Sequence, residues 1–232
     1  MRAVIVTGTD TGVGKTVTTA ALARVALDRR LAVAVVKPAQ TGISDGEPTD
    51  VEVIERLSGC SHLTELVRLS DALAPDSAAR RAGIELPNAA ELATQSLSAA
   101  ASCDLMLVEG SGGVAVRLDT AGGTLLDLAD ALATEGAGIT FVVVTRLALG
   151  TLNHTELTVE AIRRRGHPVA GLVIGAVPEH LGLAERSNLS DLPRVTGLPV
   201  LGSLPHGVGH WQPSRFRAAC AQWFEPDWLV QP

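Results

Sequence analysis

Short apolar runs alternate along this chain with longer segments in which apolar residues recur at helical spacing. The short runs lie at residues 2–7, 33–36, 105–108, 139–144, 169–174 and 199–204. The helical patterns lie at about residues 15–28, 88–101, 153–165 and 214–224, and Asp50 begins a shorter one. Strands that are apolar throughout and alternate with helices are typical of a parallel sheet covered on both faces. We therefore predict an α/β fold with a doubly wound, mostly parallel sheet.

The whole chain, residues 1–232, is expected to form a single domain, because it contains no internal repeat and no low-complexity linker. Asn88 is the expected N-cap of the helix at 88–101, since its side chain can accept hydrogen bonds from the free N–H groups of a helix. The pattern is weakest at residues 63–87, which could hold a short extra strand and a short helix.

Composition narrows the classes of function. The formal net charge is −6 and only 3% of the residues are aromatic. A negative surface repels a phosphate backbone, and scarce aromatic rings leave few platforms for base stacking, so we expect no nucleic-acid partner. The basic run at 163–165 suits the C-terminus of a helix, where the helix dipole favours cations.

The same sequence gives no sign of a membrane or export role. No apolar run reaches membrane-spanning length, and the first strand begins almost at Met1, which leaves no room for a signal peptide. Cys60, Cys103 and Cys220 are far apart and form no C-x-x-C pair. We expect reduced thiols in a cytoplasmic protein, with no zinc site and no membrane partner.

A glycine-rich loop joins the first predicted strand to the first predicted helix. It reads G-T-D-T-G-V-G-K-T from Gly8 to Thr16. Backbone N–H groups of such a loop bind phosphate oxygens, Lys15 would reach the outer phosphates, and the Thr16 hydroxyl would bind Mg²⁺. The two outer glycines are one residue further apart than in the standard pattern, yet the context and the G-K-T ending still favour a P-loop NTPase-like fold. The residues expected to bind nucleotide here are Gly12, Val13, Gly14, Lys15, Thr16 and Val17.

Two carboxylates are expected to complete the metal site. Glu109 follows the run at 105–108, at the sheet edge where parallel α/β sheets bind ligands, and G-S-G-G follows it. Asp50 comes after the polar loop at 42–48. We predict that Thr16, Asp50 and Glu109 surround Mg²⁺, and that Gly112 contacts the nucleotide. A solvent-exposed carboxylate for Glu109 and a simple helix N-cap for Asp50 are the alternatives.

The chain contains only two lysines, Lys15 and Lys37, and its other basic residues are arginines. An ammonium is a compact point charge, whereas a guanidinium is a broad planar fork, so a tight phosphate cradle can hold the first and exclude the second. Lys37 begins K-P-A-Q-T-G after the second strand, at the same edge of a parallel sheet as the phosphate loop. Two ammonium groups facing one triphosphate would offset the charge on a phosphoryl group in transfer.

Together these segments resemble the dethiobiotin synthetase family. The matching pieces are G-T-D-T-G-V-G-K-T at 8–16, K-P-A-Q-T-G at 37–42, V-E-G-S-G-G at 108–113 and L-G-T-L-N-H at 149–154. The resemblance implies a ligase of biotin biosynthesis that uses Mg²⁺ and a nucleoside triphosphate. In the family, 7,8-diaminononanoate captures carbon dioxide as a carbamate, the carbamate attacks the γ-phosphate, and the second amine closes the ureido ring of dethiobiotin by displacing phosphate from the resulting carbamic–phosphoric anhydride.

The resemblance also implies roles for single residues. Lys37 would hold the carbamate and the transferring phosphoryl group, while Lys15 and Thr11 would contact the phosphates, which makes these three the candidate catalytic residues. Thr41 would contact the diamine or its carbamate.

Gly150 and Asn153 would bind the substrate carboxylate at the start of a helix. Family members receive this contact from a second protomer, which implies a homodimer with active sites at the interface. A plain helix N-cap is the alternative for Asn153.

One departure from the family concerns the base. Family members often carry an asparagine after the fifth strand that contacts the adenine edge, whereas this chain has Gly175 there. We therefore predict a relaxed or altered nucleotide preference. CTP and other pyrimidine triphosphates are the alternatives to ATP that should be tested. Gly175, Ala176, Leu204 and Pro205 are the candidates for the base pocket.

Three rival functions remain open at this stage. Partition or septum-positioning ATPases share the phosphate loop but usually carry a signature lysine where this chain has Asp10. Amide-forming enzymes of cobalamin synthesis generally add a glutaminase domain for which this chain has no room. A non-catalytic nucleotide-binding module would leave Lys37 without a role.

Overall fold

The computed structural model describes residues 1–43, 46–225 and 228. Residues 44 and 45, inside the polar loop predicted at 42–48, therefore lie outside the described residues. In chain order the strands are β1 (Arg2–Gly8), β2 (Val33–Lys37), β3 (His62–Glu65), β4 (Leu105–Gly113), β5 (Gly138–Thr145), β6 (Val169–Val177) and β7 (Val200–Pro205). The α-helices are α1 (Lys15–Asp28), α2 (Asp50–Ser58), α3 (Pro75–Ala82), α4 (Ala89–Ala99), α5 (Leu125–Thr134), α6 (Thr151–Arg164), α7 (Leu183–Thr196) and α8 (Pro213–Ala219).

The seven strands of the described residues form one sheet in the order β3-β2-β4-β1-β5-β6-β7. Every neighbouring pair is parallel, so the predicted doubly wound parallel sheet is confirmed. β1 lies at the centre, between β4 and β5. Because Val6 of β1 pairs with Glu109 of β4, the end of β1 lies beside the acidic end of β4, and β2 delivers Lys37 on the other side of β4.

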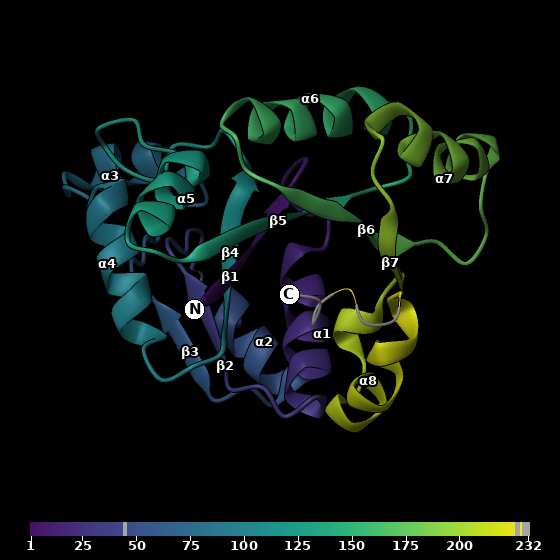
Figure 1. Ribbon diagram of the computed structural model, residues 1–232, viewed down its shortest axis with the longest axis horizontal. Helices are drawn as coiled ribbons and strands as arrows, with labels where there is room; N and C mark the ends of the chain where they lie inside the picture. The colour runs from purple at the N-terminus through teal and green to yellow at the C-terminus, as the bar shows by residue number, and fades with distance from the viewer. Residues whose placement is uncertain (44–45, 226–227, 229–232) are drawn as a thin grey trace.

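Helices cover both faces of the sheet (Figure 1). On one face α1, α2 and α8 enclose an apolar core, and on the other face α4, α5, α6 and α7 enclose a second one. Four consecutive small or branched residues of α1, from Ala20 to Ala23, are fully buried. The three alanines among them let α1 lie close to the sheet, and the short loop from β1 places the N-terminus of α1 at the carboxyl end of that strand.

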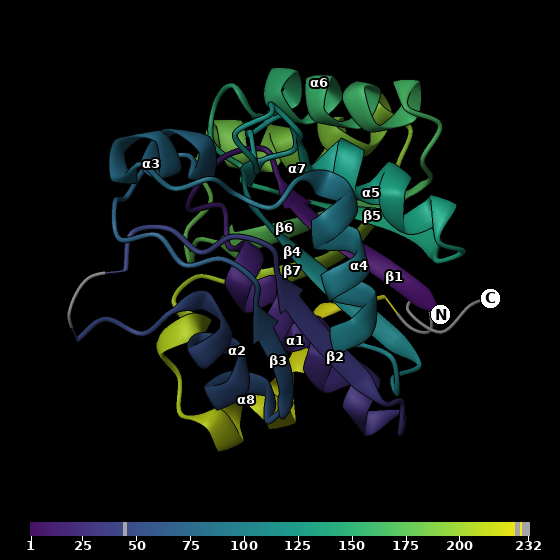
Figure 2. The same cartoon turned by 90° about the vertical axis from the view of Figure 1, so that its left-hand side faces the viewer.

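The weakly patterned segment at 63–87 does contain one strand and one helix, β3 and α3. β3 pairs with β2, and the parallel pairing continues beyond the strands, because Leu66 N–H donates to the Lys37 carbonyl and Gln40 N–H donates to the Val67 carbonyl. Figure 2 shows α3 on the same side of the molecule as the connection from β2 to α2. The chain after β3 therefore supports the turn that carries Lys37.

Several predicted boundaries were wrong. The strand predicted at 105–108 extends to Gly113, so Glu109 lies within β4 rather than at its end. The helix predicted at 153–165 begins at Thr151, with Gly150 as its N-cap. The helix predicted at 214–224 ends as an α-helix at Ala219, and a 3-10 turn, Cys220–Trp223, follows it.

Two helices, α5 and α7, had not been predicted. α5 has a capping box, in which Thr124 and Asp127 bond each other's backbone N–H groups, and this signal was present in the sequence. α7 offers no such signal, because its buried positions include the polar Asn188 and Thr196 and because Pro193 lies inside it. Asn188 instead donates a hydrogen bond to the Leu147 carbonyl (2.7 Å), which fastens α7 to the segment before α6.

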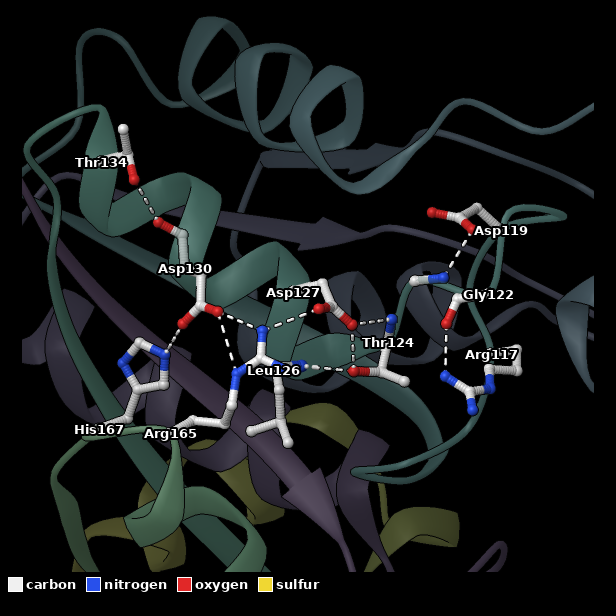
Figure 3. A network of polar contacts seen from close by, with 11 residues as sticks. Arg117, Asp119, Gly122, Thr124, Leu126, Asp127, Asp130, Thr134, Arg165 and His167 are labelled. Atoms are coloured by element: carbon white, nitrogen blue, oxygen red, sulfur yellow. Dashed lines mark hydrogen bonds and ion pairs between the residues drawn. The ribbon is translucent and has the colours of Figure 1, made fainter.

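A polar network joins α5 to the end of α6 (Figure 3). Arg165, the C-cap of α6, lies between two carboxylates, with 2.8 Å from its Nη2 to Asp127 Oδ1 and 3.0 Å from its Nε to Asp130 Oδ2. Asp130 also contacts His167 Nε2 at 2.7 Å. The basic run thus lies at a helix C-terminus, as expected.

In the part of the chain that the structure describes, no helix is long and apolar enough to cross a membrane.

Candidate active site

The phosphate loop connects the central strand β1 to α1, and glycines shape it. Gly12 (φ 73°) and Gly14 (φ 98°) adopt left-handed backbone conformations that residues with a side chain rarely occupy. A Cβ atom added to Gly175 of β6 would lie 1.9 Å from the Val13 carbonyl oxygen. The end of β6 therefore packs directly on the back of the loop, and this contact requires a residue without a side chain.

Lys15 is buried at the start of α1, with 7% of the residue exposed. Its Nζ donates to the Asp10 carbonyl at 3.0 Å, a hydrogen bond that connects the start of α1 to the first half of the phosphate loop. Burial lowers the pKa of Lys15 and the nearby charge of Lys37 lowers it further, against the opposing effect of Glu109. The carboxylates near Lys15 therefore only partly offset the effects of burial and of the second lysine on its pKa.

Lys37, at the end of β2, is 3% exposed and lies between two carboxylates. Its Nζ is 2.5 Å from Asp50 Oδ2 and 2.9 Å from Glu109 Oε1, and it donates to the Gly110 carbonyl at 3.3 Å. Burial alone would lower the pKa of Lys37, but Glu109 and Asp50 outweigh burial and raise it. Since an ammonium has three N–H donors, one of these contacts must break before Lys37 can bind another oxygen.

Three oxygen-bearing side chains meet beside Lys37. The Thr16 hydroxyl lies 2.9 Å from Asp50 Oδ1 and 2.9 Å from Glu109 Oε1. Its single proton can serve only one of the two acceptors. Glu109 is fully buried, burial raises its pKa, and its Oε2 has no hydrogen-bond partner among the described residues.

This cluster fits a small hard cation. Mg²⁺ prefers oxygen ligands and usually takes only one or two carboxylates from the protein. A cation at this position would balance the two carboxylates and give a partner to the orphaned Glu109 oxygen. In residues 1–43, 46–225 and 228 no group of three or more histidine, cysteine, aspartate or glutamate side chains could hold a metal ion, and this cluster combines two carboxylates with a hydroxyl instead.

Both alternatives for the carboxylates were wrong. Glu109 is fully buried rather than exposed to solvent. The N-cap of α2 is Thr49, which forms a capping box with Glu52, and Asp50 is the first helical residue. The Asp50 side chain faces Lys37. Burial alone would raise the pKa of the Asp50 carboxyl group, but the charge of Lys37 outweighs burial and lowers it.

The loop, Lys37 and the carboxylates line one cavity of about 660 Å³. The predicted site residues that line it are Thr11, Gly12, Gly14, Lys15, Thr16, Val17, Lys37, Thr41, Asp50, Glu109 and Gly112. Lining residues that had not been predicted are Gln40, Gly42, Ala72, Leu73, Ala74, Pro75, Ser111 and Val116. Gln40 and Ser111 stand inside recognised motifs, which was the available signal. The wall at 72–75 comes from the segment leading into α3 and had none.

Other predicted residues lie outside this cavity. Val13 is buried behind the loop, and Gly175 packs against it. Ala176 follows Gly175 in β6, and Leu204 and Pro205 end the neighbouring strand β7.

Gly150 and Asn153 lie at the start of α6, outside the cavity of their own chain. Asn153 is exposed and is the third residue of α6, so the N-cap alternative for it was wrong, since Gly150 (φ 92°) occupies that position. Two leucines near them, Leu149 and Leu157, are 88% and 61% exposed.

Comparison with known proteins gives closely related sequences. A family model described as an AAA domain matches residues 2–208. An ATP-dependent dethiobiotin synthetase BioD from Rhodococcus jostii is 49% identical over 229 residues, which cover 99% of this chain and 97% of that protein. The protein of the same description from Streptomyces coelicolor is 46% identical and covers 97% of this chain and 93% of its own length.

Among solved structures, the septum site-determining protein MinD of Pyrococcus horikoshii, complexed with Mg-ADP, matches with a TM-score of 0.56. The match covers 95% of this chain and 94% of that chain at 15% sequence identity. At this identity the likeness concerns the fold alone.

Proposed function

The chain belongs to the family of ATP-dependent dethiobiotin synthetases, and we propose that the cavity at the carboxyl edge of its sheet is where it closes the ureido ring of dethiobiotin. The enzyme is a ligase of biotin biosynthesis that consumes a nucleoside triphosphate. The observation that carries the proposal is the convergence of Lys15 and Lys37 on one cavity from two separate turns.

The reaction needs no protein nucleophile. One amine of 7,8-diaminononanoate adds to carbon dioxide and loses a proton, giving a carbamate. A carbamate oxygen then attacks the γ-phosphorus and ADP leaves, which forms a carbamic–phosphoric anhydride. The second amine attacks the carbonyl carbon, the bond from that carbon to the phosphate oxygen breaks, and inorganic phosphate leaves as the amine loses a proton. The work of the protein in each step is to hold the reacting atoms and to balance negative charge.

Lys37 and Lys15 divide that work. Lys37 gives up one of its present contacts and binds the carbamate and the moving phosphoryl group, while Lys15 and Thr11 hold the phosphates of the nucleotide. Thr41 faces the diamine. The apolar wall at 72–75 and Val116 supports this placement, because it offers contact to the alkyl chain of such a substrate.

Thr16, Asp50 and Glu109 would hold Mg²⁺, supported by their convergence and by the unpartnered Glu109 oxygen. The cation would supply charge balance to the β- and γ-phosphates when bound. Lys37 lies in contact with the same carboxylates, so the positions of the ammonium and of the metal ligands depend on each other.

The active form is proposed to be a homodimer. The exposed Leu149 and Leu157 beside Gly150 and Asn153 support an interface there, at which the start of α6 would bind the substrate carboxylate in the partner's cavity. Sedimentation that gives only monomer at working concentration would contradict this. We also propose that residues 1–232 act as one domain in the cytoplasm, with no membrane or nucleic-acid partner.

Nucleotide selection is proposed to be relaxed. Gly175 has no side chain to contact a base and is already engaged with the phosphate loop. Base contacts would then come from backbone groups near Ala176, Leu204 and Pro205, which discriminate bases less sharply than an asparagine.

One assay tests the reaction and the nucleotide together. The purified chain is incubated with 7,8-diaminononanoate, bicarbonate, Mg²⁺ and either ATP or CTP, and dethiobiotin is measured by mass spectrometry. We expect product that depends on all components, at comparable turnover with ATP and CTP. No product with any triphosphate would reject the function, whereas product with ATP alone would reject only the relaxed selection.

A further inference from the structure

Gln40 bridges the two ends of the connection from β2 to α2. Gln40 is buried, with 9% of its surface exposed. The side-chain Oε1 accepts a hydrogen bond from the backbone N–H of Asp50 at 3.2 Å, and Nε2 donates to the Thr41 carbonyl at 2.9 Å. One neutral side chain therefore connects the turn that carries Lys37 to the first residue of α2.

The backbone of Gln40 is fixed independently of that side chain. Its N–H donates to the Val67 carbonyl and its carbonyl accepts from Leu69 N–H, both at 2.9 Å. The Ser111 hydroxyl also donates to the Ala39 carbonyl at 2.6 Å, which ties the same turn to β4. Gln40 thus stands on a rigid base that is part of the sheet edge.

Asp50 is fixed less completely by its own helix. The capping box of Thr49 and Glu52 shapes the N-terminus of α2 but makes no bond to the turn after β2. The Gln40–Asp50 bond supplies that link and occupies a backbone N–H that lacks a partner inside the helix. Lys37 and Thr16 contact the Asp50 carboxylate, whereas the Gln40 bond holds the backbone from which that side chain extends.

We propose that Gln40 is a positioning residue: it holds the N-terminus of α2 so that Asp50 stays within reach of a divalent cation bound at Thr16 and Glu109. This inference rests on the proposed function, because it uses the cation ligands named there. A neutral side-chain to backbone hydrogen bond of this kind corresponds to about a two- to tenfold change in an equilibrium constant. The expected signature is weaker cation binding in an otherwise folded protein.

The experiment measures Mn²⁺ binding to the full chain in complex with a non-hydrolysable ATP analogue, by electron paramagnetic resonance. Gln40→Leu removes both hydrogen bonds with little change of volume, and we expect its Mn²⁺ dissociation constant to rise about two- to tenfold. Asn88→Ala is the matched control. It removes the acceptor for the N–H groups of Ala90 and Glu91 at the start of α4, away from the cavity, and should leave Mn²⁺ binding unchanged.

Asp50→Asn separates the two proposals. If it weakens Mn²⁺ binding while folded Gln40→Leu binds as wild type does, the role of Gln40 is overturned and the cation ligands stand. If Asp50→Asn also binds like wild type, the cation ligands fail and this inference fails with them. Should Gln40→Leu not fold, amide exchange in the wild type decides: an Asp50 N–H as protected as those inside α2 supports the bond, and one that exchanges freely overturns it.

Discussion

The phosphate loop and the turn after β2 each present one lysine to the same cavity, but they hold it in different ways. The loop is shaped by glycines and by the backbone of β6 behind it, and Lys15 donates to a carbonyl of its own loop. The turn after β2 is held by hydrogen bonds to three other segments, and Lys37 lies between two carboxylates.

The difference separates a preformed anion site from a charge-balanced one. The loop offers backbone N–H groups and the cation of Lys15, whose charge neighbouring carboxylates offset only in part, and this suits a ligand that arrives with several negative charges. In the turn after β2, Asp50 and Glu109 already balance the charge of Lys37. The Lys37 ammonium can therefore bind a ligand only when these carboxylates bind another cation. Binding of nucleotide should therefore depend mainly on the loop, and chemistry mainly on the turn.

The sharpest test of this division replaces each lysine. Lys37→Ala should lower kcat by about 10³-fold, the typical loss when a charge-stabilising group is removed, and should weaken nucleotide binding less than Lys15→Ala does. Lys37→Arg should also fail, because a broad planar fork cannot replace a compact point charge at a position that is only 3% exposed. The measurements are steady-state turnover and calorimetric binding of the ATP analogue. If the two alanine variants lose kcat equally and Lys15→Ala binds nucleotide as the wild type does, the proposed division of roles is wrong.

A second prediction concerns the backbone support of the loop. Gly175→Ala would place a methyl group against the Val13 carbonyl, so the loop must move, and we expect the free energy of unfolding to fall by about 2 kcal/mol or more together with weaker nucleotide binding. Gly138→Ala in β5 is the control, because an added Cβ there meets no atom within 4 Å. Denaturant unfolding and calorimetry measure both effects. Wild-type behaviour of Gly175→Ala would show that the loop needs no close contact with β6.

The smallest expected effect lies outside the site, in the carboxylates that pair with arginine rather than lysine. Asp127 accepts hydrogen bonds from Thr124 and Arg165, which outweigh its partial burial and lower its pKa to about 2 (Figure 3). Because the folded pKa lies below the unfolded value near 3.8, this stabilisation is present above pH 4 and is lost as pH falls toward 2.

Asp127→Asn should therefore flatten the fall in unfolding free energy between pH 4 and pH 2, by less than about 1 kcal/mol since the pair is partly exposed. Glu160→Gln, in the exposed pair with Arg164, is the control and should change that slope less. If the unfolding free energy of Asp127→Asn falls between pH 4 and pH 2 as steeply as that of the wild type, the Asp127 carboxylate does not cause the fall.

Much of this site follows from the sequence because its residues stand where strands end. The phosphate loop, Lys37 and Glu109 each come after an apolar run, and parallel strands bring their carboxyl ends to one edge. The parallel arrangement could be predicted, as could an extra strand and helix at 63–87, whereas the order of the strands in the sheet could not. Strand order depends on pairing between distant segments, which no local pattern encodes.

The parts that escaped prediction are set by long-range contacts. The wall at 72–75 reaches the cavity because the segment before it pairs with the turn after β2, where Gly42 N–H donates to the Asp71 carbonyl at 3.1 Å, and no motif includes Asp71. The close approach of Gly175 to Val13 depends on where β6 ends relative to β1. α7 was missed because polar residues occupy its buried face, one of which bonds a neighbouring loop.

The burial of Lys15 and Lys37 in one cavity has a practical chemical consequence. These are the only ε-amines of the chain, so reagents that acylate primary amines have no ordinary surface lysine to consume. Attachment of a dye or a solid support through amines is directed either to the α-amino group or into the cavity itself. Gradual inactivation by such a reagent, slowed by a triphosphate, would report on occupancy of the cavity without any engineered label.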